Sequence, residues 1–149
     1  MKRFVAFCFL VLLTACTSQN KYSDFDYSYS RSGGGYAPIY ENLWIKGNTA
    51  QYSFEGEGKK VKKAFKISSE DLQKIENTLN QQNFRTIKED YKKVYDHISI
   101  SINAKKGNNS ASKSDASLII SEDKARWEAV VNAFQEIINA HPDLATVNK

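Results

Sequence analysis

Hydrophobic and polar residues alternate along most of the first half of the chain. The alternation covers residues 25–30, 39–46, 49–55 and 61–67. A period of two is typical of strands that bury one face. Gly47-Asn48 separates the second run from the third, which indicates a hairpin with a tight turn. This half of the chain therefore predicts four strands.

The second half contains two stretches in which apolar residues recur at helical spacing. Residues 69–82 follow Ser68, whose hydroxyl, with the acidic Asp71 three positions later, is typical of a helix N-terminus. Residues 122–140 carry a wide apolar stripe, and Ser121 is the expected cap of this helix. The stripe consists of Trp127, Val130, Val131, Phe134, Ile137 and Ile138. Both stretches predict amphipathic helices.

Between the helices the pattern predicts two further strands, residues 94–103 and 117–120, joined by a polar loop over residues 105–115. The two helical stripes need an apolar surface, and the inward faces of the strands are the available one. We therefore expect an α+β fold, with an antiparallel sheet of about five to six strands and two amphipathic helices packed on one face. Residues 25–149 would form this single domain.

The first residues of the chain have the layout of a secretory signal peptide. Lys2 and Arg3 precede an unbroken apolar run over residues 4–13, which is too short to span a membrane. The run ends in Leu13-Thr14-Ala15-Cys16, which resembles the lipobox of bacterial lipoproteins. A plain secretory signal with a nearby cysteine is the alternative interpretation.

The resemblance implies cleavage after residues 1–15 and lipid chains on Cys16, which would anchor the protein in a membrane. Residues 16–24 would then form a polar tether. Thr17 follows the cysteine, and in lipoproteins sorted between two membranes the absence of aspartate there implies the outer membrane. We therefore expect a lipid-anchored protein of the bacterial cell envelope.

Composition and charge narrow the possible functions. The chain has 149 residues, 41% hydrophobic and 26% charged, which fits one domain. Removal of Lys2 and Arg3 with the leader leaves 19 basic against 17 acidic residues, too small an excess for a nucleic-acid partner. Cys8 leaves with the leader as well. The sequence contains no recognisable catalytic motif and no cysteine or histidine cluster, so we expect no enzyme activity, no cofactor and no metal site.

A glycine triplet is the candidate site for a partner. Ser32, Gly33, Gly34, Gly35 and Tyr36 follow the first predicted strand, and their backbone could enter the groove of another protein. The structural alternative is a bulge or bend that needs a positive φ angle. The surrounding tyrosines are compatible with a recognition surface or with cross-strand aromatic pairs.

The order of these features is similar to that of emfourin-like proteins, which are small inhibitors of thermolysin-like metalloproteases. The resemblance covers residues 27–141 and includes the glycine triplet, Asn83-Phe84 after the first helix and Tyr95-Asp96-His97. Emfourins usually carry an aromatic-Ala-Gly sequence after the glycines, and here Pro38 replaces that last glycine. The resemblance implies an α+β inhibitor fold whose glycine loop contacts a protease.

Together these features predict a non-catalytic envelope lipoprotein that binds another protein, with metalloprotease inhibition as the most specific version. One alternative is a structural or accessory subunit of an outer-membrane assembly. Another is a lipoprotein that binds a small molecule or lipid, which would need an apolar cavity of several hundred Å³ between sheet and helix.

Overall fold

The computed structural model describes residues 24–141 and Leu144. The predicted signal peptide, the lipobox with Cys16 and residues 16–23 of the predicted tether lie outside the described residues.

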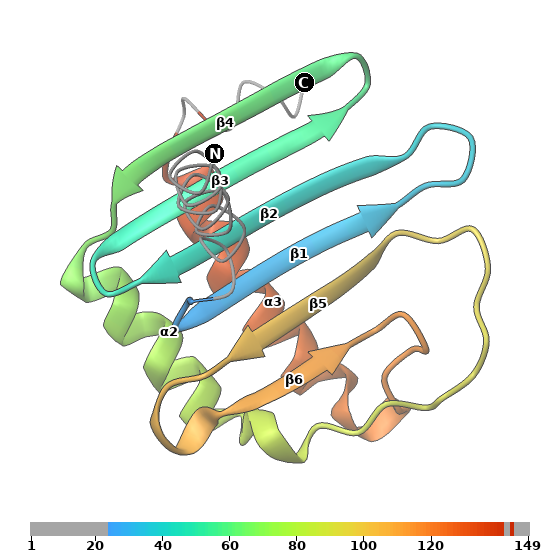
Figure 1. Cartoon of the computed structure of the whole chain (residues 1–149). Coiled ribbons are helices and arrows are strands. Elements are labelled where there is room, and N and C mark those ends of the chain that lie inside the picture. Colours follow the sequence, from blue (N-terminus) through green and yellow to red (C-terminus); the bar gives the residue numbers. More distant parts are fainter. Residues whose placement is uncertain (1–23, 142–143, 145–149) are drawn as a thin grey trace, which may run out of the picture.

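The described chain folds into one antiparallel sheet with two long helices behind it (Figure 1). Its strands are β1 (Tyr27–Gly33), β2 (Ile39–Lys46), β3 (Thr49–Gly56), β4 (Lys59–Lys66), β5 (Ser99–Ala104) and β6 (Ala111–Ser114). The helices are α2 (Ser69–Gln81) and α3 (Lys124–Asn139), and short 3-10 turns cover Phe84–Thr86, Gly107–Asn109 and Ser121–Asp123. The spatial order is β4-β3-β2-β1-β5-β6. This is the α+β fold that the sequence predicts.

The four predicted strands of the first half form a meander in which each strand pairs with its neighbour in sequence. Lys46 pairs with Thr49 across the turn at Gly47-Asn48, as expected for a two-residue hairpin loop. Gly47 has a φ of 54°, which a residue with a side chain adopts only at a cost. In β2 and β3 the alternation of the sequence becomes one buried face and one more exposed face. In β1, Ser28 is buried as well as Tyr27 and Tyr29, and β4 contains no fully buried residue.

The helices cover the face of the sheet that carries the aromatic and aliphatic side chains. All six residues of the predicted stripe on α3 are buried. The ring of Phe134 stacks on the ring of Tyr29 from β1, with centroids 6.0 Å apart. Phe84, just after α2, is fully buried in the same core. One continuous core therefore joins the meander to α3.

The two helices are capped differently at their N-termini. The Ser68 hydroxyl accepts a hydrogen bond from the backbone N–H of Asp71 at 3.0 Å, so the predicted cap of α2 is confirmed. Ser121 does not cap α3, because residues 121–123 form a 3-10 turn and α3 begins at Lys124. Asp123 occupies the cap position instead.

The prediction for residues 94–120 was wrong in three places. The strand β5 begins at Ser99, because Asp96 has a φ of 56° and cannot continue an extended strand. Strand β6 lies inside the predicted loop. Residues 117–120 form no strand, and their one sheet-like contact is an isolated bridge between Ile119 and Glu89. Leu118, with a φ of 63°, breaks the extended conformation there.

The other face of the sheet has no helix on it among the described elements, and small polar side chains lie at its centre. Hydroxyls and amides bond across neighbouring strands: Ser30 donates to Asn42, Asn42 to Ser53, and Asn103 to Ser28. These hydrogen bonds satisfy polar side chains that are partly or, for Ser28, fully buried.

Candidate functional site

The glycine loop, residues 32–36, joins β1 to the chain that leads into β2 and lies against the segment before β5. Gly33, Gly34 and Gly35 all have positive φ angles, of 128°, 104° and 42°. A Cβ atom on Gly33 would lie 2.3 Å from the carbonyl oxygen of His97. Only glycine fits this close backbone approach, so the structural reason for the triplet is present.

The loop has a defined conformation. The Ala37 N–H donates to the Gly34 carbonyl oxygen at 2.9 Å and closes a turn, which places Tyr36 at its outermost point. Gly35 lies beside Asp96, whose Oδ1 would be 3.7 Å from an added Cβ atom. The loop therefore rests on residues 96–98 and presents Tyr36 outward.

Exposed apolar side chains gather around this loop. Tyr36 is fully exposed, and Tyr40, Tyr95 and Ile98 are exposed by 53%, 77% and 41%. Tyr36 and Ile98 line one open hollow together with Gly34, Gly35 and Asp96. We call the glycine loop with Tyr40 and residues 95–98 the tip. The glycine loop is conspicuous in the sequence, but Ile98 is not. The alternation of the predicted strand over residues 94–103 places Ile98 on its buried face.

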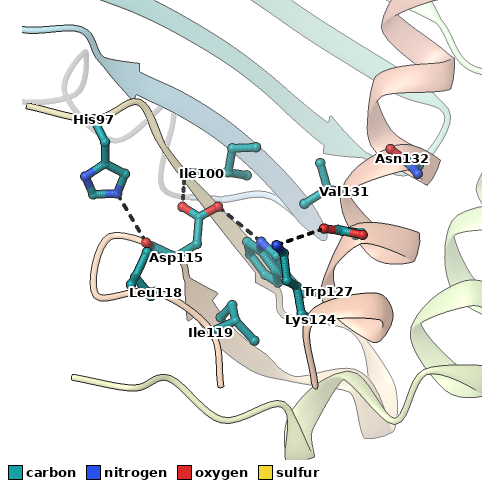
Figure 2. A pocket seen from close by; sticks show the side chains of 10 residues that line it. His97, Ile100, Asp115, Leu118, Ile119, Lys124, Trp127, Val131 and Asn132 are labelled. Atoms are coloured by element: carbon teal, nitrogen blue, oxygen red, sulfur yellow. Dashed lines mark hydrogen bonds and ion pairs between the residues drawn. The ribbon is translucent and has the colours of Figure 1, made fainter. Parts of the chain in front are cut away.

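A second hollow lies between β5 and α3, on the helix-covered side of the sheet (Figure 2). It has a volume of about 350 Å³. Its walls are largely apolar and come from three separate parts of the chain: Ile100, Leu118, Ile119, Trp127 and Val131. Polar side chains of His97, Lys124, Glu128 and Asn132 also line it. We call this cavity the β5–α3 pocket.

Asp115 organises the wall of the β5–α3 pocket. One carboxylate oxygen accepts from the Ile100 N–H at 2.6 Å, and the other accepts from the Trp127 indole N–H at 3.2 Å. Its main-chain carbonyl oxygen lies 3.3 Å from His97 Nε2 and accepts from the Leu118 N–H at 2.8 Å. One residue thus ties β5, the 115–118 turn and α3 together.

The sequence did not predict which residues come together in this pocket. Trp127 and Val131 were predicted as core residues, and Asp115 lay at the end of a predicted loop. A period-two or helical pattern reports which face of one element is apolar, and it does not report where two elements diverge. Asp115 links Ile100 of β5 to Trp127 of α3 in the pocket wall, and only the folded chain brings these three residues together.

A polar cluster lies elsewhere on the covered face. Glu41 is 4% exposed, and it accepts from the Tyr52 hydroxyl at 2.8 Å and from Arg31 Nη1 at 3.4 Å. Burial, with the neighbouring Glu41, raises the pKa of Tyr52 far above its usual range. Burial also raises the pKa of Tyr29 to about 12. Both phenols therefore stay neutral and serve as hydrogen-bond partners near neutral pH.

Three further findings concern metal binding, membrane crossing and similarity to known proteins. In residues 24–141 and 144, no three histidine, cysteine, aspartate or glutamate side chains are grouped so that they could hold a metal ion. The helices of that same part lack the length and hydropathy that a membrane crossing requires. Comparisons with models of known protein families and with curated proteins find no match to this chain.

Proposed function

We propose that this chain is a non-catalytic lipoprotein of the bacterial cell envelope, held at the membrane by lipid on Cys16, that binds another protein through the tip. The anchor rests on the leader and lipobox of the sequence. The binding role rests on the exposed side chains of Tyr36, Tyr40, Tyr95 and Ile98 at one end of the sheet.

That cluster is the single observation that carries the proposal. Tyrosines give large contact areas at low conformational cost, and they are enriched where one protein recognises another. The glycine loop beneath Tyr36 is held by a closed turn and by its contact with His97 and Asp96. A preformed loop loses little conformational entropy on binding, which favours affinity.

Cross-linking in intact cells tests the binding role. A photo-crosslinking amino acid at Ala37, which is exposed beside Tyr36, should yield a discrete adduct, and Tyr36→Ala should abolish it. Tyr91→Ala removes another largely exposed tyrosine outside the tip and should leave the adduct intact. Equal adducts with both variants would contradict a binding role for the tip.

Metalloprotease inhibition is the most specific version of this proposal, and it rests on the similarity to emfourin-like proteins. The turn over residues 34–37 is closed by a hydrogen bond and presents the fully exposed Tyr36, which is the part of the chain that would contact the protease. The full chain should then reduce the activity of thermolysin in proportion to its concentration, and Tyr36→Ala should weaken this effect at least tenfold. Stoichiometric co-purification with an envelope complex and no inhibition would favour an accessory subunit instead.

The anchor has its own test. Mass spectrometry of the native protein should find an N-terminal Cys16 with acyl chains, and Cys16→Ser should move the protein out of the membrane fraction. A native N-terminus at another residue would overturn the proposed location without affecting the binding tests.

A further inference from the structure

The β5–α3 pocket has the size and the apolar lining of a small-molecule site. It is a concave space of about 350 Å³ whose apolar walls are already in place, which is within the range of small-molecule sites. Exposed Leu118 stands at one side and buried Trp127 and Val131 at the other. The walls are held by the Asp115 hydrogen bonds to Ile100 and Trp127, so a ligand would not have to order them.

The charges along the pocket indicate what the ligand should carry. Four side chains that line it are acidic or basic: His97, Asp115, Lys124 and Glu128. His97 Nε2 lies against the main-chain carbonyl oxygen of Asp115 and not against its carboxylate. Lys124 Nζ lies 4.0 Å from Glu128 Oε1, so these two charges face each other on α3. The remaining carboxylate is that of Asp115.

The Asp115 carboxylate receives hydrogen bonds from two neutral groups, the Ile100 N–H and the Trp127 indole N–H. An ionised carboxylate can accept about four hydrogen bonds in all, two at each oxygen. Within the described residues no basic side chain is paired with it in an ion pair. A negative group with spare acceptor capacity therefore lies beside an apolar cavity and a tryptophan, which is a favourable setting for an organic cation.

We propose that the β5–α3 pocket binds a small organic cation, an alkyl- or arylammonium compound whose apolar body lies among Ile100, Leu118, Ile119 and Val131 and whose ammonium group bonds Asp115. The ammonium would add an ion pair without displacing either existing hydrogen bond of the carboxylate. This site shares only His97 with the tip, and neither set of tests changes that residue, so the failure of either proposal would leave the other standing.

Tryptophan fluorescence tests the proposal directly, because the chain has two tryptophans and Trp44 lies on β2. In the full chain with Trp44→Phe, Trp127 is the sole reporter. Hexylamine should change its emission and saturate with a Kd on the order of 1 mM, as expected for so small a ligand. Hexanol should bind more weakly, and hexanoate more weakly still.

Three variants separate charge from shape. Asp115→Asn should weaken hexylamine at least tenfold and leave hexanol within about threefold. Glu122→Gln, which removes one negative charge from the turn before α3 but does not line the pocket, should change neither by more than about threefold. Val131→Phe should fill the cavity and reduce binding of both compounds. Because Asp115→Asn removes a structural tie, circular dichroism must show that the variant is folded, and Val131→Phe provides a test that leaves Asp115 in place.

The outcomes are distinct. Saturable binding of hexylamine that depends on Asp115 supports the proposal. Equal or tighter binding of hexanoate, no saturation by hexylamine, or an unchanged Kd in Asp115→Asn would overturn it. Nα-acetyl-lysine amide keeps its ε-ammonium group free and therefore presents the alkylammonium group of a lysine side chain in a protein. Binding equal to that of hexylamine would assign the source to a polypeptide, and much weaker binding would assign it to a free amine.

Discussion

The meander β1–β4 and the segment from residue 82 to residue 127 are held together in different ways. In the meander, each strand pairs with its sequence neighbour through a regular ladder, and apolar residues alternate with polar ones. In the later segment, charged side chains tie irregular backbone in place. Arg126 binds the carbonyl oxygens of Gln82 and Asn83, Asp123 binds the Lys88 N–H, and Glu89 binds the Ser114 N–H.

The difference explains where the candidate sites lie. A regular ladder leaves no room between strands, and its backbone groups are already paired. Irregular backbone held by side chains can turn outward, as Asp96 and Leu118 do with their positive φ angles. The walls of the β5–α3 pocket and residues 95–98 of the tip come largely from the later segment and α3. The glycine loop and Tyr40 come from the meander, so the tip lies where the two regions meet.

The largest expected effect tests whether the two regions share one core. Phe134→Ala should destabilise the protein by about 3–5 kcal/mol, because it opens a cavity between α3 and Tyr29 of the meander. Urea unfolding followed by tryptophan fluorescence should still show one transition for both regions. Tyr36→Ala, at an exposed position, should change stability by less than about 0.5 kcal/mol. Two separate transitions would contradict a shared core.

Two glycines of the meander compare a backbone position that touches the later segment with one that does not. Gly33→Ala should cost at least about 2 kcal/mol, since its φ is 128° and the new Cβ atom would collide with the His97 carbonyl oxygen. Gly47→Ala, in the meander hairpin, should cost about 1 kcal/mol, because its φ is also positive but nothing lies within 4 Å. Urea midpoints measure both, and equal losses would mean that the loop can move away from His97.

A tyrosine pair tests the polar groups inside the meander. Tyr52→Phe should cost about 1–3 kcal/mol, because buried Glu41 loses the hydrogen bond from the Tyr52 hydroxyl. Tyr27→Phe should be neutral within about 0.5 kcal/mol or stabilising, because the Tyr27 hydroxyl is buried and has no hydrogen-bond partner among the described residues. A comparable loss in both variants would count against this explanation.

The smallest effect concerns acid stability of the later segment. The Lys88 N–H hydrogen bond, with the Arg126 guanidinium, lowers the pKa of Asp123 below its ordinary value. A carboxyl whose pKa is lower in the folded state stabilises the fold above its unfolded pKa of about 4 and stops doing so as the pH falls through the folded value. The wild-type advantage over Asp123→Asn should therefore be full above about pH 5 and shrink below about pH 4.

Denaturant unfolding at pH 7, 5, 4 and 3 measures that advantage, and hydrogen exchange of the Lys88 amide reports the tie itself. Glu122→Gln removes a charge from the same turn and provides the reference for a general charge effect. An advantage that stays constant down to pH 3 would show that Asp123 does not hold the segment through its charge.

The sequence predicted the four strands of the meander, the hairpin between β2 and β3, and the two helices, because their signals are local. A period of two over residues 39–46 or a stripe at helical spacing on α3 is created by burial of one face, and neighbouring residues record it. The glycine loop was also visible, since three consecutive glycines indicate unusual backbone. Ile98, which lies beside the loop in the tip, could not be recognised in this way. Alternation assigns Ile98 to the buried face of the predicted strand, and it is exposed because the backbone turns at Asp96, which has a positive φ angle.

Strand β6 and the β5–α3 pocket could not be predicted from local sequence patterns. Residues 111–114 (Ala-Ser-Lys-Ser) show no apolar alternation, and they form a strand because they pair with β5. Residues 118–120 are apolar and leave the sheet, because Asp115 bonds to Ile100 and Trp127 and redirects the chain. In both cases a residue distant in sequence decides the outcome against the local preference.

The order of residues alone predicted the α+β fold and the glycine loop after the first strand, both of which the folded chain contains, since each depends on residues close together in the chain. The leader with a lipobox is a prediction of the same local kind, and it lies outside the described residues. The folded chain alone places Tyr36 beside Ile98 and opens a cavity beside Asp115. Those arrangements depend on hydrogen bonds and backbone turns between distant segments, and such interactions leave no periodic trace in a single sequence.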